Sequence, residues 1–163
     1  MPTFFIEMGQ GIIATGDFSV TTSRLHNCIL ISGYNDEKKA GVFHYPSLAL
    51  VNNNEEIQQD LMNWFVTLAP THVLLTQGPS TEYQDYSKLC DWFEEESIKP
   101  TETKPAIHPV MKFINSKLEV EDYIIDPLSN KNIQIIQVQK QGAGNYAING
   151  FSYKLVGKNR ENL

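Results

Sequence analysis

Short apolar runs separated by turn residues dominate the first part of the chain. Residues 3–8 and 12–15 lie on either side of a glycine-containing turn and predict two strands. Residues 28–34 are apolar on both faces of a strand, a pattern typical of a strand covered on both sides. Residues 40–44 follow a polar, turn-like segment and supply a partner strand. The pattern therefore predicts a β-hairpin over residues 28–44.

The middle of the chain changes to helical spacing. Asn54 is a suitable N-cap, and the apolar residues that follow recur every three or four positions, which predicts a helix ending near Leu68. A buried strand is expected over residues 72–76, and a second amphipathic helix over residues 85–95. Residues 112–118 are interpreted as a further short helix.

The last part of the chain returns to strand patterns, over residues 123–125, 133–138 and 146–155. Strands outnumber helices, and several are expected to pair antiparallel. We therefore predict an α+β fold, with mixed, largely antiparallel β-sheets packed as a sandwich and flanked by helices. A chain of 163 residues fits one domain, assigned to residues 1–156, with a flexible C-terminal tail at 157–163.

Charge and composition exclude several classes of function. The net charge is −6, which argues against a nucleic-acid partner and, more weakly, against an anionic membrane surface. No apolar run approaches the length of a membrane span, and residues 1–7 lack the basic and apolar regions of a cleaved Sec signal. Two cysteines cannot form a disulfide framework, so a reducing compartment is favoured, although one disulfide between them stays possible.

Cys28 and His44 lie on the two strands of the predicted hairpin. If the turn centres on Asp36, the two residues face each other, with Cβ atoms roughly 4.5–5.5 Å apart. At that separation an imidazole can accept the proton of a thiol nucleophile. The alternative is a buried structural cysteine, which is common. The polar residues 20–27 before the strand favour a reactive thiol near solvent.

Two other kinds of site are not supported by the spacing of the residues. Residues 9–14 match the dinucleotide pattern G-x-G-x-x-A, but poor helix sequence follows them, and this motif needs a helix. The histidines at positions 26, 44, 72 and 108 match no compact metal-ligand motif. We therefore expect no cofactor and no metal, and His26 is interpreted as a possible lining residue of the thiol pocket.

The segment 9–46 resembles the CheD family of chemoreceptor glutamine deamidases. That family has Thr-(five residues)-Cys before an apolar strand, and later Gly-x-x-His before a proline. The matching residues here are Thr22, Cys28, Gly41, His44 and Pro46. The spacing from threonine to cysteine is also similar to that of toxin deamidases of the cytotoxic-necrotizing-factor type. The remainder of the chain agrees with the family in the order of its elements.

The resemblance implies a cofactor-independent protein-glutamine deamidase with a Cys-His-Thr triad. Cys28 would be the nucleophile that forms a thioester, and His44 the base. Thr22 would orient the imidazole, with Thr21 as an alternative for that role. The backbone N–H groups of Cys28 and Asn27 would hold the oxyanion.

The family usually has Leu-Gly-Ser-Cys or Leu-Ser-Gly-Cys at the nucleophile, whereas this chain has Leu-His-Asn-Cys at residues 25–28. This departure favours a diverged relative, or a bacterial effector or toxin acting on a host protein, over an ordinary chemotaxis deamidase. The expected partner is a protein substrate, either a chemoreceptor or a host regulatory or translation protein. The expected location is cytoplasmic, or a host cell reached without a cleaved Sec signal.

Other functions stay open at this point. The same fold can serve as a non-catalytic protein-binding module in which Cys28 is structural. Within the enzyme class, the chain can be a CheD-type chemoreceptor deamidase, a transglutaminase if an acyl acceptor other than water enters, or a cysteine protease. Reactivity of Cys28 separates the enzyme from the binding module, because a structural thiol is inert.

Overall fold

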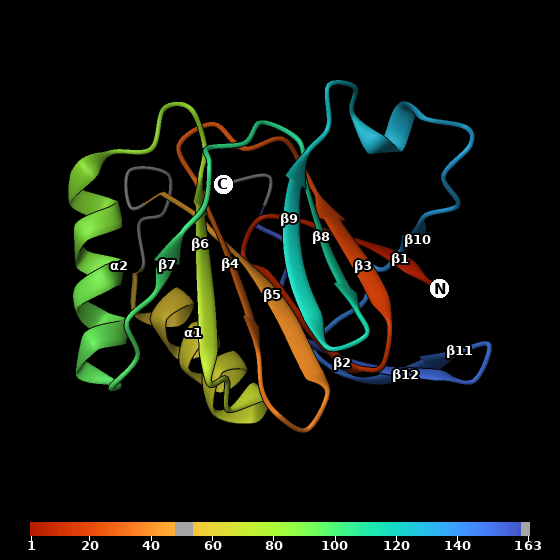
Figure 1. The fold of residues 1–163 in the computed structure, drawn as a ribbon, viewed down its shortest axis with the longest axis horizontal. Coiled ribbons are helices and arrows are strands. Elements are labelled where there is room, and N and C mark those ends of the chain that lie inside the picture. The colour runs from red at the N-terminus through yellow and green to blue at the C-terminus, as the bar shows by residue number, and fades with distance from the viewer. Residues whose placement is uncertain (48–53, 161–163) are drawn as a thin grey trace.

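A computed structural model describes residues 1–47 and 54–160 and contains two β-sheets and two α-helices (Figure 1). The five-stranded sheet has the order β10 (Ile136–Gln137), β1 (Thr3–Ile6), β3 (Phe18–Thr22), β8 (Pro109–Ile114) and β9 (Lys117–Asp122). The seven-stranded sheet has the order β11 (Gly144–Ile148), β12 (Phe151–Gly157), β2 (Gln10–Thr15), β5 (Lys39–Tyr45), β4 (Ile29–Tyr34), β6 (His72–Gln77) and β7 (Thr101–Glu102). The helices are α1 (Asn54–Leu68) and α2 (Tyr83–Glu95), and a 3-10 turn follows β9 at Pro127–Ser129.

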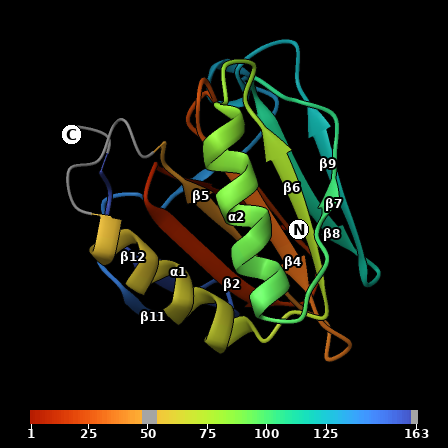
Figure 2. The same ribbon diagram turned by 90° about the vertical axis from the view of Figure 1, so that its left-hand side faces the viewer.

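The elements form three layers. Both helices cover one face of the seven-stranded sheet, and the five-stranded sheet covers the other face (Figures 1 and 2). Seven of the ten strand pairings among the described residues are antiparallel. The predicted α+β class, with largely antiparallel mixed sheets flanked by helices, is confirmed.

Alternating side chains of the seven-stranded sheet supply two separate cores. On β5, Val42 points into the core between the two sheets, and Phe43 points into the core under the helices. This alternation is the period of two expected of a strand with apolar layers on both sides. Aromatic rings fill the core between the sheets, where Phe4 and Tyr153 have centroids 4.8 Å apart.

Helix α1 is fixed to the seven-stranded sheet by Trp64. Its Nε1 donates to the backbone oxygen of Ile12 at 3.3 Å. A Cβ atom on Gly41 would lie 3.0 Å from the same Nε1, so this close approach of helix and strand requires glycine at position 41. The helix begins and ends where the apolar spacing predicts.

The β4–β5 hairpin forms, but the predicted register is wrong. His44 is paired with Leu30 and not with Cys28. The loop has three residues between Asn35 and Lys39, and Lys38 takes a left-handed conformation (φ 62°), the arrangement of a three-residue hairpin loop with a bulge. The turn is therefore centred one residue later than expected, which shifts every pair by two positions. A shift of two leaves Cys28 and His44 on the same face.

Several predictions in the later part of the chain are wrong. The expected helix at 112–118 is a hairpin of β8 and β9, because Val110, Met111 and Phe113 bury apolar surface and residues 115–116 form a left-handed two-residue turn. The expected strand at 123–125 is an exposed loop in which Ile124 is 99% accessible. Of residues 133–138, only Ile136–Gln137 pairs with the sheet.

Some elements differ in extent from the prediction. Residues 146–155 belong to two strands, β11 and β12, joined by a turn with Asn149 and Gly150 at positive φ. Strand β3 was not expected. Gly157 ends β12 and Arg160 is buried, so residues 157–160 are not the flexible tail that we expected. Residues 161–163 lie outside the described part of the chain.

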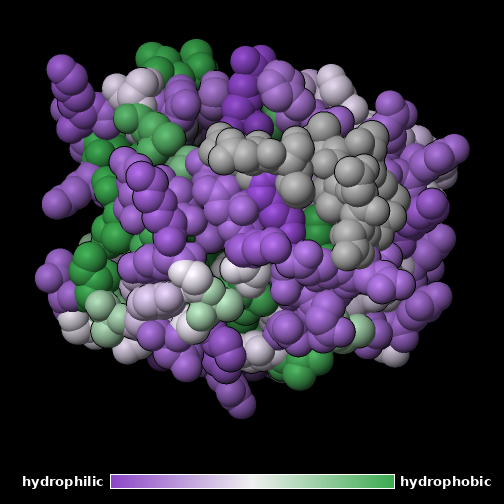
Figure 3. All heavy atoms as spheres, turned by 180° about the vertical axis from the view of Figure 1, so that it is seen from behind, coloured by the Kyte–Doolittle hydropathy of each residue, from purple (hydrophilic) through white to green (hydrophobic). Residues whose placement is uncertain are grey.

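The fold bears on two questions raised by the sequence, which are nucleotide binding and membrane-spanning segments. Residues 9–14 enter strand β2, and no helix begins within them, so the dinucleotide pattern has no structural basis here. No helix within residues 1–47 and 54–160 is long and apolar enough to span a membrane. The face seen in Figure 3 is mainly hydrophilic, with apolar residues in small, separate groups.

Candidate functional site

Cys28 lies directly before β4, in a loop that is anchored to the end of β6. Its carbonyl oxygen accepts hydrogen bonds from the Gly78 backbone N–H at 3.1 Å and from Thr81 Oγ1 at 2.9 Å. The carbonyl oxygen of His26 accepts from the Ser80 backbone N–H at 2.8 Å. A Cβ atom on Gly78 would lie only 2.3 Å from this carbonyl oxygen, so the two segments can approach only with glycine at position 78. The loop that carries the thiol is therefore held in a fixed position.

His44 lies on the face of β5 that points into the core between the sheets, two residues beyond Val42. Cys28 belongs to the same core, together with Leu30, the residue paired with His44. Cys28 is thus a diagonal neighbour of His44 and not its direct partner, with Cα atoms expected roughly 7–8 Å apart. The two side chains lie on the same face of the sheet, but they are farther apart than the predicted register implied.

Thr22 contacts the imidazole from the opposite sheet. Its Oγ1 lies 2.6 Å from His44 Nδ1 and donates to the Ile6 carbonyl oxygen at 2.8 Å. Because the hydroxyl proton is used by Ile6, the Nδ1–H of His44 must donate to the threonine oxygen. This hydrogen-bond network assigns the tautomer with a lone pair on Nε2. The expected contact between Thr22 and His44 is therefore present and joins the two sheets.

The Nε2 atom of His44 is buried and has no hydrogen-bond partner among the described residues. Burial lowers the pKa of His44 to about 3, so the imidazole is neutral at physiological pH. A buried polar atom without a partner costs roughly 1–3 kcal/mol. The lone pair of Nε2 is thus buried without a donor, in a defined tautomer, although this costs stability. A proton acceptor in a catalytic site is expected to have this arrangement.

Cys28 is 5% exposed, and burial raises the pKa of its thiol. A hydrogen bond from the Ser47 backbone lowers this pKa, and the negative charge of Asp85 raises it. Asp85 lies in the first turn of α2 and accepts a hydrogen bond from Ser47 Oγ at 3.2 Å. The thiol and the imidazole are thus both uncharged before any reaction begins.

Met8 covers the thiol, with its Sδ atom 3.7 Å from Cys28 Sγ. The backbone N–H of Gly9, the next residue, donates to the His44 carbonyl oxygen at 2.9 Å. Met8, Ser47 and Asp85 were not expected at the site. A lone methionine after a strand and a serine before a helix carry no sequence signal of such a role.

The other candidate residues do not join this cluster. Thr21 Oγ1 donates to the Pro109 carbonyl oxygen at 3.3 Å, on the opposite side of β3 from Thr22, so Thr21 does not orient the imidazole. His26 is exposed, and His72 is stacked on Tyr34 with the rings 4.8 Å apart. Within the described ranges, no group of three or more His, Cys, Asp or Glu residues is arranged to hold a metal ion.

Comparison with known proteins adds no relative. No protein-family model, no curated protein sequence and no solved structure matches this chain. The assignment of a function therefore depends on the cluster of Thr22, His44 and Cys28 alone.

Proposed function

We propose that this protein is a cysteine-dependent amidohydrolase that converts a glutamine side chain on a protein substrate to glutamate. The observation that carries the proposal is the hydrogen bond between Thr22 and His44. It joins the two sheets, fixes the imidazole tautomer and leaves the lone pair of Nε2 without a hydrogen-bond partner among the described residues, on the core face that also contains Cys28. A nucleophile, a base and a group that orients the base are the three parts needed for acyl transfer through a thiol.

The reaction begins with transfer of the Cys28 thiol proton to His44 Nε2 as sulfur attacks the amide carbon of the glutamine side chain. The transfer occurs together with attack, because burial disfavours a separate thiolate–imidazolium pair. The imidazolium then gives its proton to the leaving nitrogen, and the C–N bond breaks to release ammonia and leave a thioester. The backbone N–H groups of Cys28 and Asn27 are the proposed donors to the oxyanion.

Water completes the cycle. His44 Nε2 removes a proton from water as its oxygen attacks the thioester. The C–S bond then breaks, and the imidazolium returns this proton to the sulfur, which gives the carboxylic acid and the free thiol. Throughout both steps, Thr22 accepts the Nδ1–H hydrogen bond and keeps Nε2 directed to the reacting atoms. An amine in place of water would give transglutamination at the same site. The proposed substrate is a chemoreceptor or a host regulatory or translation protein.

A second function is supported by a different observation. Cys28 is almost fully buried under Met8, and its pKa is raised, which are properties of a structural thiol. In this alternative the protein is a non-catalytic protein-binding module, and the cluster stabilises the contact between the sheets. Reactivity of Cys28 distinguishes the two functions.

The test is intact-mass analysis of candidate substrates incubated with the protein. The candidates are chemoreceptor cytoplasmic fragments, small GTPases and translation factors. Each deamidation adds about one mass unit, because NH₂ is replaced by OH. We expect a gain with the wild-type protein and with Cys90→Ser, which removes the second cysteine, on α2. We expect none with Cys28→Ser or His44→Asn.

Two outcomes would contradict the proposed enzymatic function. If no candidate substrate gains mass, and iodoacetamide modifies Cys28 no faster than Cys90 even after Met8→Ala has removed the side chain that contacts the thiol, the binding module is the better description. If Cys28→Ser retains the mass gain, then Cys28 is not the nucleophile.

A further inference from the structure

We propose that the turn formed by residues 7–10 is a cover over Cys28 that must open for substrate to enter, and that Arg160 is the positioning residue that holds it closed. The inference rests on the proposed function, because the covered thiol is the proposed nucleophile. It adds a control element that the Cys-His-Thr cluster does not contain.

The turn contacts both reacting residues. Met8 Sδ lies 3.7 Å from Cys28 Sγ, and the Gly9 backbone N–H donates to the His44 carbonyl oxygen at 2.9 Å. Met8 is partly exposed, whereas Cys28 beneath it is 5% exposed. Gln10 closes the turn, since its backbone N–H donates to the carbonyl oxygen of residue 7 at 3.1 Å. The Met8 side chain, which solvent reaches in part, therefore lies directly against the buried thiol.

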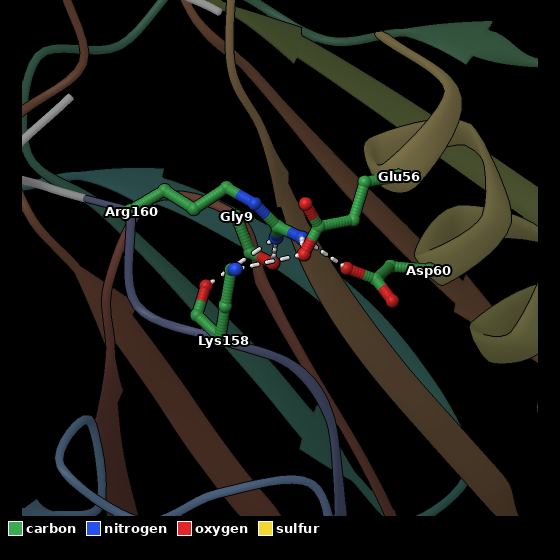
Figure 4. A network of polar contacts seen from close by, with 5 residues as sticks. All are labelled: Gly9, Glu56, Asp60, Lys158 and Arg160. Carbon is green, nitrogen blue, oxygen red and sulfur yellow. Dashed lines mark hydrogen bonds and ion pairs between the residues drawn. The ribbon is translucent and has the colours of Figure 1, made fainter. Parts of the chain in front are cut away.

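Arg160 holds this turn from the other side. Its backbone N–H donates to the Met8 carbonyl oxygen at 2.9 Å, and its Nη1 donates to the Gly9 carbonyl oxygen at 2.9 Å. Its Nη2 forms ion pairs with Asp60 and with Glu56, the latter at 3.0 Å, both on α1 (Figure 4). The Arg160 side chain is 3% exposed. One guanidinium thus ties the turn to the helix.

Glycine at position 9 is required by this arrangement. Gly9 has φ +87°, and a Cβ atom there would lie 2.9 Å from the Arg160 side chain. A Cβ atom on Gly157, with φ +77°, would lie 2.4 Å from the Gly9 carbonyl oxygen. The turn and the segment that carries Arg160 are therefore packed against each other without space for a side chain.

The closed arrangement conflicts with catalysis unless the turn moves. A glutamine amide must come within about 3–3.5 Å of the sulfur before attack. The Met8 side chain occupies a position in contact with that sulfur. Methionine is unbranched, with three rotatable bonds, so it can leave its position once its backbone is released. Release of the turn requires the loss of the Arg160 hydrogen bonds to Gly9 and Met8 and of the Gly9 hydrogen bond to His44.

The experiment measures the rate at which iodoacetamide alkylates Cys28 in a Cys90→Ser background, between pH 6 and 9. Arg160→Met removes the guanidinium and keeps an apolar side chain, and Met8→Ala removes the covering sulfur. Lys158→Ala is the matched control, because Lys158 pairs with Glu56 at 2.9 Å and is largely exposed. Arg160→Lys tests whether a positive charge, without the forked geometry of the guanidinium, is enough to keep the turn closed over Cys28.

We expect Arg160→Met and Met8→Ala each to raise the alkylation rate about tenfold or more, because hydrogen bonds from a charged donor are the strong ones. The two changes combined should give little more than either alone, because both act on one cover. Lys158→Ala should stay close to the background rate, and Arg160→Lys should lie in between. The increase should be similar at every pH, because it reflects access and not thiol acidity.

A purely structural Arg160 gives a different result. If Arg160→Met lowers the unfolding midpoint, but its Cys28 is alkylated no faster than that of Lys158→Ala, the proposal is wrong. If Arg160→Met does not fold, Met8→Ala decides, and an unchanged alkylation rate there overturns the cover. Alkylation does not require hydrolysis, so a faster rate without any deamidation contradicts the proposed function and leaves the cover in place.

Discussion

The buried, neutral His44 makes the stability of this protein dependent on pH. Burial lowers its pKa from 6.5 to about 3, so the folded state binds fewer protons at this site than the unfolded state below pH 6.5. Stability from this residue is fully present above pH 6.5 and is lost as the pH falls toward 3. We expect His44→Asn to remove this dependence, because asparagine does not titrate and its amide can still donate to Thr22.

The size of the effect follows from the two pKa values of His44, 6.5 unfolded and about 3 folded. Each unit of difference corresponds to about 1.36 kcal/mol. Between pH 7.5 and 4.5, the free energy of unfolding of the wild-type protein should fall by about 3 kcal/mol more than that of His44→Asn. The slope of this difference should approach about 1.4 kcal/mol per pH unit near pH 5, which is the value for one proton.

The assay is urea unfolding of both proteins at half-unit pH steps, because the difference between them cancels the titration of other groups. His26→Asn is the control, since His26 is exposed and should follow the wild-type curve. Parallel curves for the wild-type protein and His44→Asn between pH 7.5 and 4.5 would refute a buried neutral imidazole. Such a result would also remove the basis for treating Nε2 as an available base.

Other perturbations test the residues around the site. Thr22→Val should lower stability by about 1–3 kcal/mol, because His44 Nδ1–H loses its acceptor, and should change the ¹⁵N shifts of the imidazole, whereas Thr22→Ser should retain the tautomer. Gly78→Ala should destabilise the loop before β4, since the added Cβ would lie 2.3 Å from the His26 carbonyl oxygen, and thermal unfolding should begin at a lower temperature. Asn35→Ala should lower the free energy of unfolding in urea by about 2–3 kcal/mol, because the Asn35 side chain forms hydrogen bonds with both the hairpin turn and the end of α1. An unchanged urea midpoint would contradict the role of Asn35 in setting the register.

The β4–β5 hairpin shows how far a local pattern predicts a structure. The apolar residues on both faces of 28–34 identified a strand covered on both sides, and the strand is covered by helices and by the second sheet. The register was wrong because it depends on the conformation of the turn, where Lys38 is left-handed and Asn35 accepts two backbone hydrogen bonds. Neither feature changes the hydrophobic pattern.

The prediction for residues 109–125 was wrong for a different reason. Met111 and Phe113 occur two residues apart, which is strand spacing, but lysines and a short apolar run also fit one turn of helix. The structure forms a hairpin there because β8 pairs with β3 and supplies apolar side chains to the core between the sheets. Pairing with a strand about ninety positions earlier in the chain has no local signal.

By itself, the sequence determined the two helices and the strand-rich class, because these depend on the spacing of neighbouring residues. Cys28 and His44 share a face only because the error in the predicted register was an even number of residues. The resemblance to glutamine deamidases, and not the pattern, pointed to Thr22. The tertiary structure alone decided that Thr22 reaches His44 across the sheets, that Met8 contacts the thiol, and that the Arg160 backbone N–H donates to Met8. These contacts join segments distant in the chain, and they form only because packing of the two sheets and α1 brings those segments together.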